Sequence, residues 1–315
     1  MAYQAGPYTN LNNALDLWRG FLLSEGWTIN QFTVGAEARL HVQKIIRGRY
    51  RFFNFLSGAG LAFGTYGDSF SGIGVNGSTG YNAGLSADAQ PGYTTDIYTT
   101  APGTGDSNGG CLDHMYNLGG DYFFFATDTS ASAVFSVGSP DTEYAMMTIG
   151  VTDEGYSMYA ASGGQGEEVS SDGSTRAAYL ASVGASYSNY FDGASGLFDG
   201  TGWFVSDQGQ GGVPWGLNNQ IRATGRNFRQ DGSQAEQICR YSPDGFRGNA
   251  PMAPCALTVT QAVGSVFYPV GTLEGVYFLN AKNYTDTQEI TYGGDTFKIF
   301  ANNRAQIPYG VAFKK

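Results

Sequence analysis

The chain has 315 residues, 42% of them hydrophobic, which is enough for one large or two ordinary domains and excludes a chain that is disordered throughout. Its 47 glycines, 15% aromatic residues and only 14% charged residues are typical of a β-rich protein with long ordered loops rather than a helical metabolic enzyme. The net charge is −10, and residues 52–175 hold 14 acidic residues without any Lys or Arg. This distribution excludes a positively charged nucleic-acid footprint over the centre of the chain.

The first predicted element is an amphipathic helix in NLNNALDLWRGFLLSEGW, which starts at residue 10. Its large apolar residues follow a 4-3-4 spacing, which places them on one helix face: Leu11, Leu15, Trp18 and Leu22. Asn10 or Asn12 can cap the start of this helix, and Gly26 can end it. We therefore expect one helix near the N-terminus with a single buried face.

A meander of strands is predicted after the helix. WTINQF is followed by a hairpin in which Leu40 and Val42 alternate with polar residues, a turn falls near residues 47–49, and residues 50–56 form the return strand. Residues 58–110 are rich in Gly, Ser, Thr, Tyr and Asp and lack a strong period. A long irregular stretch of this kind is usually functional or interfacial, so we interpret it as a loop insertion.

The four consecutive aromatic residues Tyr122 to Phe125 are either a ligand platform, for a sugar or a nucleobase, or the interior of a sheet. Successive side chains of a strand point to opposite faces, so both faces of this strand would be aromatic. A platform needs its aromatic residues on one exposed face, and the pattern therefore favours a strand buried on both faces. A turn over residues 128–130, a strand from Ala131 to Val137 and a third strand in EYAMMTIGV complete this predicted unit.

Residues 153–235 are again Gly-rich, with short strands expected around residues 177–187, and β-like segments return in the last third: ALTVTQAVGSVFYP, VYFLN, DTFKIFANN and YGVAFKK. We predict an α+β fold that is mostly β, with an N-terminal helix packed on an antiparallel sheet, long Gly-rich loop insertions and a C-terminal β region. Residues 1–152, with the insertion at 58–110, form the first predicted unit. Residues 153–315 form a loop-rich β region that belongs to the same compact unit or follows it.

The sequence contains no recognisable catalytic constellation. GTYGDSFSG, residues 64–72, includes a Gly-Asp-Ser sequence that is similar to the nucleophile block of the SGNH hydrolases. Those enzymes need a downstream Asp-x-x-His, whereas His114 has Cys111 at the Asp position. His41, the only other histidine, lies in an alternating strand pattern and is interpreted as a strand-face residue.

Carboxylate pairs such as Glu167 with Glu168, or Asp192 with Asp199, are interpreted as solvated loop residues rather than a glycosidase pair. No phosphate loop, dinucleotide fingerprint or EF-hand spacing occurs in the sequence. We therefore expect no catalytic residues, no cofactor and no metal site, and leave calcium binding by the acidic loops open.

Basic residues form two local clusters: Lys44, Arg47, Arg49 and Arg51 in the early hairpin, and Arg222, Arg226 and Arg229 in NNQIRATGRNFRQ. We interpret both clusters as contacts to acidic neighbouring subunits, and direct nucleic-acid contact as the less favoured alternative.

The three cysteines have no CxxC spacing and are interpreted as buried free thiols, with a pairing of Cys239 and Cys255 as the alternative. MAYQAGPYTN lacks the basic start and apolar run of a signal peptide. No apolar stretch approaches the ~20 residues needed to cross a membrane. We therefore expect a soluble protein made in a cytoplasm.

Several segments together resemble a loosely defined family of virion structural proteins from tailed bacteriophages. The resemblance rests on the helix followed by EGWTINQF, RLHVQK and YRFFNF, on GGDYFFFA and PMAPCALTV, and on VGTLEGVYFLNAKNYTDTQEITYGGDTFKIFANN with the final YGVAFKK. It covers mostly the two ends of the chain and the central hairpin. It implies a part of the neck, tail or baseplate of a virion, and it supplies no active-site residues.

With the missing catalytic motifs and low charge content, this resemblance predicts a non-enzymatic virion component that forms a symmetric homo-oligomer and contacts other virion proteins. The long inserts would make the contacts between subunits. The alternative is a glycan- or receptor-binding protein whose Tyr- and Trp-rich loops, including Trp203 and Trp215, engage a cell-surface glycan. A glycan-cleaving enzyme with an unrecognised carboxylate pair is the third interpretation.

Overall fold

The computed structural model describes part of the chain, and every structural statement concerns that part. The described ranges are 1–61, 70–86, 90–92, 110–112, 119–136, 144–162, 168–169, 175–176, 195–198, 203–205, 219–223, 252–261, 267–280, 283–302 and 309–315. In these ranges one helix accompanies antiparallel strands, which confirms the prediction of an α+β fold that is mostly β.

Three antiparallel sheets make up most of the described structure. The central sheet has seven strands, in the order β1 (Ala2–Tyr8), β7 (Gly120–Ala126), β8 (Ser130–Ser136), β9 (Tyr144–Val151), β10 (Ser157–Ser162), β13 (Ser195–Phe198) and β14 (Trp203–Val205). The N-terminal sheet has five, in the order β2 (Thr28–Val34), β3 (Ala38–Ile46), β4 (Arg49–Leu61), β5 (Phe70–Ser78) and β6 (Gly110–Leu112). The C-terminal sheet has six, in the order β15 (Asn219–Ala223), β16 (Ala253–Gln261), β17 (Phe267–Asn280), β20 (Tyr309–Lys314), β19 (Asp295–Asn302) and β18 (Glu289–Tyr292). A separate pair is formed by β11 (Glu168–Val169) and β12 (Thr175–Arg176).

Helix α1 (Leu11–Ser24) forms where the apolar spacing predicts it. Its N-cap is Asn10, whose side-chain oxygen accepts a hydrogen bond from the backbone N–H of Asn13 at 2.9 Å. Asn12 instead donates from its side chain to the carbonyl oxygen of Gly35. After the helix the chain turns at Gly26, whose φ of +78° is the left-handed conformation that glycine adopts without strain.

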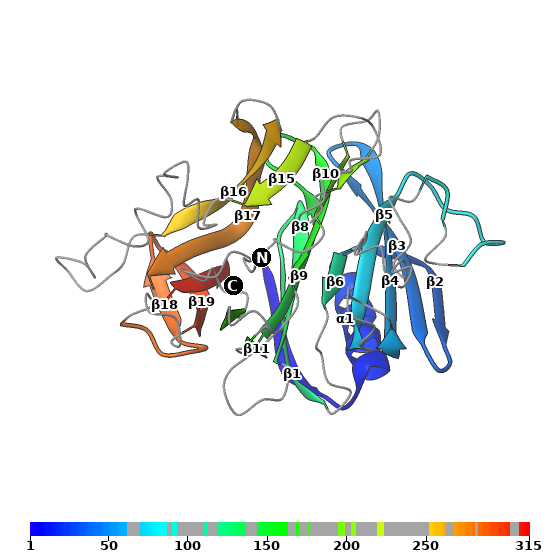
Figure 1. Ribbon diagram of the computed structural model, residues 1–315, viewed down its shortest axis with the longest axis horizontal. Helices are drawn as coiled ribbons and strands as arrows, with labels where there is room; N and C mark the ends of the chain where they lie inside the picture. Colours follow the sequence, from blue (N-terminus) through cyan, green and yellow to red (C-terminus); the bar gives the residue numbers. More distant parts are fainter. Residues whose placement is uncertain are drawn as a thin grey trace.

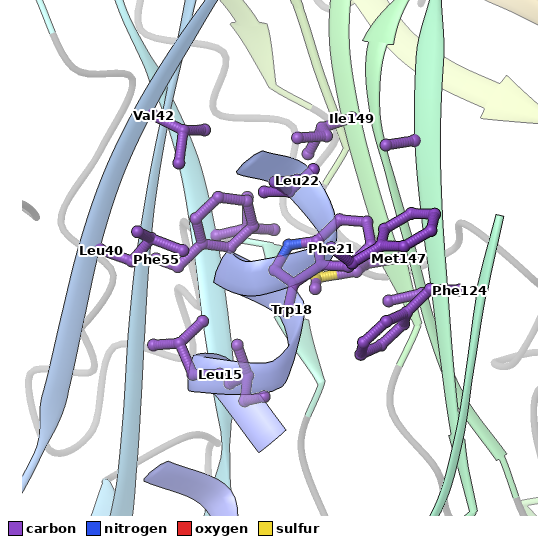
Figure 2. Close-up of a cluster of buried hydrophobic side chains, with 14 of the residues drawn as sticks. Leu15, Trp18, Phe21, Leu22, Leu40, Val42, Phe55, Phe124, Met147 and Ile149 are labelled. Atoms are coloured by element: carbon purple, nitrogen blue, oxygen red, sulfur yellow. The ribbon is translucent and has the colours of Figure 1, made fainter. Parts of the chain in front are cut away.

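The largest core lies between the N-terminal and central sheets, with α1 enclosed between them (Figures 1 and 2). Trp18 and Phe21 point from the helix toward Phe124 of the central sheet, with ring centroids 4.9 and 5.4 Å from that of Phe124. Leu40 and Phe55 close the core from the N-terminal sheet (Figure 2). The predicted helix on a sheet is therefore confirmed, and a second sheet covers the helix from the other side.

Strand β7 is buried on both faces, as the aromatic tetrad predicts. Tyr122 and Phe124 belong to the core around α1. Phe123 and Phe125 face the C-terminal sheet instead, where the Phe125 ring stacks on Phe313 with centroids 4.9 Å apart. The central sheet therefore forms the middle layer of the molecule (Figure 1).

Strand β5 corrects the prediction that residues 58–110 are an irregular insertion. β5 is a strand of the N-terminal sheet, paired with β4 on one side and β6 on the other. Between Gly72 and Ser78, Ile73 and Val75 belong to the core, while glycine and small polar residues occupy the alternate positions. A strand with so few large residues carries little hydrophobic period, so composition alone indicates a loop.

Strand β1 was also not predicted, because AYQAGPY contains Gly and Pro and has no apolar alternation. It pairs with β7, far away in the sequence, in a register that sets Tyr3 opposite Phe125. Strands on both sides of residue 152 also pair directly, since β10 continues the central sheet from β9. Strands β10, β13 and β14 thus continue the sheet that begins in residues 1–152. The short strands expected around residues 177–187 lie outside the described residues.

We predict that Phe124→Ala lowers the free energy of unfolding by about 3–5 kcal/mol, because Phe124 is fully buried and fills the space between α1 and the central sheet. Urea denaturation followed by circular dichroism would measure this change. Leu23→Ala on the exposed side of α1 is the matched control and should change stability by less than about 0.5 kcal/mol. Equal effects of the two substitutions would contradict the described core.

Candidate subunit-contact surface

The tip of the β3–β4 hairpin projects beyond the rest of the N-terminal sheet. The neighbouring strand β2 pairs with β3 only as far as Gln43, and β5 pairs with β4 only from Phe52 onward. Residues 44–51 therefore pair only with each other in the described structure, and we call them the hairpin arm. The arm bends toward the turn between β9 and β10 (Figure 1).

The turn predicted near residues 47–49 is present and has two central residues, Arg47 and Gly48. Arg47 and Gly48 have φ values of 54° and 75°, so both central residues are left-handed, which is the type I′ arrangement that suits the twist of a tight hairpin. The pairing of Ile46 with Arg49 closes this turn. The arm is consequently a short, regular hairpin with a fixed register.

Alternation along the two strands gives the arm an inner face, which is anchored to the rest of the chain. Lys44 donates from Nζ to the carbonyl oxygen of Glu25 at 3.0 Å and lies over the ring of Trp27, so it stabilises the C-terminal end of α1. Arg47 donates to the carbonyl oxygen of Asp153, and Arg51 donates to that of Gly155 at 3.0 Å. These bonds fix the arm to the helix and to the β9–β10 turn.

Burial of the inner face affects the protonation equilibria of its cations. Partial burial lowers the pKa of Arg51, and the nearby charges of Arg49 and Arg47 lower it further. Burial also lowers the pKa of Lys44, although Glu25 and Asp128 oppose this effect. Arginine remains charged at any physiological pH, so the arm keeps a concentrated positive charge.

The outer face of the arm carries an exposed apolar pair. Ile45 and Tyr50 stand directly opposite each other and are 57% and 58% exposed. The Tyr50 ring continues inward to Phe52, with centroids 6.0 Å apart. Arg49 is exposed at the tip, where it pairs with Ile46 on the other face of the hairpin, and it makes no ion pair with any described residue. Two adjacent exposed apolar side chains on an anchored hairpin are suited to binding another protein surface.

The β9–β10 turn that anchors the arm also contacts the C-terminal sheet. Asp153 accepts hydrogen bonds from the backbone N–H and hydroxyl of Thr272 on β17, at 2.6 and 2.7 Å. Although partial burial would raise the pKa of Asp153, these two bonds, the Glu154 N–H and the nearby Arg47 hold it below its usual value. Gly271 allows the close approach, because a Cβ there would lie 2.5 Å from Asp153 Oδ1. One turn therefore links the arm to two sheets.

The residues predicted to make subunit contacts do not lie together in the structure. Arg47 and Arg49 lie on the arm, where Arg47 is used in an intrachain bond and Arg49 is open. The backbone of Arg222 lies on β15, and that of Trp203 on β14. The remaining candidates lie outside the described residues: Arg226, Arg229 and Trp215. The sequence reasoning missed Ile45 and Tyr50, although their outward positions in a predicted hairpin, where polar residues are usual, were a usable signal.

The residues that the sequence raised as catalytic candidates gain no site in the described structure. The Gly-Asp-Ser sequence and His114 lie outside the described residues. Cys255 is a buried free thiol, as predicted for the cysteines, and Cys239 is not among the described residues. Among the described residues, no three His, Cys, Asp or Glu side chains are grouped so that they could hold a metal ion.

His41 lies on the outer face of β3, in agreement with the strand-face interpretation. Its ring is buried against Tyr81 and Phe52, and its Nδ1 accepts from the side-chain amide of Asn30 at 3.0 Å. Burial lowers the pKa of His41 to about 4, and the carbonyl of Gly80 opposes the shift only in part. His41 is thus a neutral, packed histidine at physiological pH.

Comparisons with known proteins add no family: neither the family models nor the curated proteins that were searched match this chain. In the part of the chain that is described, no helix is both long and apolar enough to span a membrane. The hairpin arm is therefore the feature on which a functional interpretation can be built.

We predict that acid destabilises the protein through His41. Its pKa is about 4 in the folded chain and about 6.5 when unfolded, so the unfolded state binds the proton first as pH falls. The stabilising contribution is complete above pH ~6.5 and is lost toward pH ~4, by about 2–3 kcal/mol. Denaturation curves of wild type and His41→Gln between these pH values would measure it. Carboxylates titrate in both proteins, so their difference isolates His41, and parallel pH profiles would contradict the assignment.

Proposed function

We propose that the chain is a non-enzymatic structural component of a tailed-phage virion, in the neck, tail or baseplate, and that it assembles as a symmetric homo-oligomer. The observation that carries the oligomer is the hairpin arm, which holds the exposed Ile45 and Tyr50 pair on a rigid projection. The resemblance of the N-terminal, central and C-terminal segments to virion structural proteins supports the location in a phage particle.

Exposed apolar residues are common on monomers, and single ones need no explanation. The pair on the arm differs because the two side chains are adjacent, lie beyond the edges of the sheet, and are fixed by three hydrogen bonds on the opposite face. Holding a contact group rigid before binding lowers the entropy lost on association. The fixed position of the pair therefore supports an intermolecular contact at the arm.

The proposal predicts that the purified chain has a mass in solution that is a whole-number multiple of the monomer mass and exceeds it, and that virions contain the chain in a fixed copy number. Sedimentation velocity and quantitative mass spectrometry of intact particles would measure these two quantities. A chain that stays monomeric at all accessible concentrations and never co-purifies with particles would overturn the proposal. Saturable glycan binding by such a monomer would favour the glycan- or receptor-binding alternative.

A further inference from the structure

We propose that the β9–β10 turn is a mechanical relay between the hairpin arm and the C-terminal sheet, so that the arm keeps a fixed direction only while the C-terminal sheet is docked on the turn. The relay lies within one chain and does not depend on the proposed assembly. It follows from the atoms that the turn uses for its two partners, from the bonds inside the turn, and from the close fit between the turn and β17.

A single residue of the turn, Asp153, is bonded to both partners. Its carbonyl oxygen accepts a hydrogen bond from the guanidinium of Arg47 on the arm. Its carboxylate accepts from the backbone N–H and the hydroxyl of Thr272 on β17, at 2.6 and 2.7 Å, and its own N–H donates to the Thr272 carbonyl at 3.1 Å. The two partners therefore use different atoms of one residue, and a shift of Asp153 changes both contacts.

The turn is cross-linked internally, so it transmits a displacement instead of absorbing it. The fully buried Thr152 donates from its backbone N–H to the carbonyl of Tyr156 at 2.9 Å, and its own carbonyl accepts from the Gly155 N–H at 2.8 Å. Its hydroxyl also accepts from the N–H of Tyr156. A movement at Asp153 therefore also moves the carbonyl of Gly155, to which Arg51 of the arm donates.

The C-terminal sheet fits against the turn without spare room. Gly271 on β17 has a φ of +112°, and a Cβ added to it would lie 2.5 Å from Oδ1 of Asp153 and 2.8 Å from Cβ of Thr152. Strand β17 is tied a second time nearby, since the hydroxyl of Thr129 donates to the carboxylate of Glu274. Close-packed contacts of this kind transmit strain, so a displacement of β17 is passed to the turn.

The relay makes the position of the exposed pair Ile45 and Tyr50 depend on the C-terminal sheet, because two of the three anchoring bonds of the arm end on the turn. Coupling between two contacts is reciprocal in free energy. The docked sheet stabilises the arm, and the anchored arm stabilises the docking by the same amount. A chain whose C-terminal sheet is not docked would thus hold its arm loosely, and a partner bound to the arm would strengthen the docking.

Gly271→Ala tests the relay from the side of the C-terminal sheet, with Gly294→Ala as the matched control. The first variant changes no charge, and its methyl group meets the β9–β10 turn rather than the arm. Hydrogen exchange followed by mass spectrometry should show the amides of residues 44–51 exchanging about fivefold faster, the change expected when one hydrogen bond is lost. Gly294 also has a positive φ, +90°, but a Cβ there meets nothing within 4 Å. The control should leave the arm unchanged, and exchange in β7 should stay the same in both variants.

Thr272→Val is a milder variant that tests the same link. It removes the hydroxyl bond to Asp153 while keeping the size of the side chain and the charge of the turn. Thr291→Val, at an exposed position of β18, is its control. Exchange in the arm should again be faster in the first variant only. Unchanged exchange of the arm in both Gly271→Ala and Thr272→Val would overturn the relay.

Arg47→Asn tests the reverse direction. Asn followed by Gly48 suits the type I′ turn, so the hairpin keeps its turn while the bond to the Asp153 carbonyl is lost. Reciprocity predicts faster exchange in residues 271–274 of β17, although the substitution lies on a different sheet. Unchanged exchange there would show that the arm and the sheet are held independently, and would also overturn the inference. These measurements concern contacts within one chain, so their outcome is independent of the mass and copy-number measurements that test the proposed function.

Discussion

Burial of β7 on both faces is the constraint on which the rest of the molecule depends. Each Phe that leaves water contributes about 1.5–3 kcal/mol, and the aromatic residues of β7 divide this contribution between two cores. Phe124 packs against α1, while Phe125 packs against the C-terminal sheet. The second core also has a polar contact, since the Tyr144 hydroxyl donates to Asp286. Burial raises the pKa of Asp286 above its usual value, and Tyr144 and the N–H of Ala301 offset part of that cost. One strand thereby holds three layers in a single arrangement.

The same layering sets the direction of the hairpin arm. The turn between β9 and β10 lies where the central sheet meets both others, and its atoms receive the hydrogen bonds of Arg47, Arg51 and Thr272. Movement of the C-terminal sheet would therefore displace the turn, and the arm with it. Packing around β7 therefore helps to position the hairpin arm, although the arm contains no residue of β7. The hydrogen bonds to the β9–β10 turn connect the two.

Local sequence signals predicted the elements whose structure is decided locally. The 4-3-4 spacing of apolar residues predicted α1, and the alternation around Leu40 predicted β3. The four consecutive aromatic residues from Tyr122 to Phe125 predicted that β7 is buried on both faces. β1 pairs with β7, distant in the chain, and both β1 and β5 contain glycines that interrupt the apolar alternation, so no local period marks them. The basic hairpin was visible in composition, but its division into an anchored and an open face was not. The acceptor of Arg47 lies 106 residues away, and only the folded sheets bring it within reach.

That division gives the arm its chemical character. A cation that binds a carboxylate inside its own chain is neutralised before any partner arrives, whereas one that binds a carbonyl is held in place with its charge intact. The arm uses carbonyls for all three of its anchoring bonds. The arm is therefore held by neutral acceptors, and the carboxylates of Glu25, Asp128 and Asp153 act on Lys44 and Arg47 only through longer-range attraction.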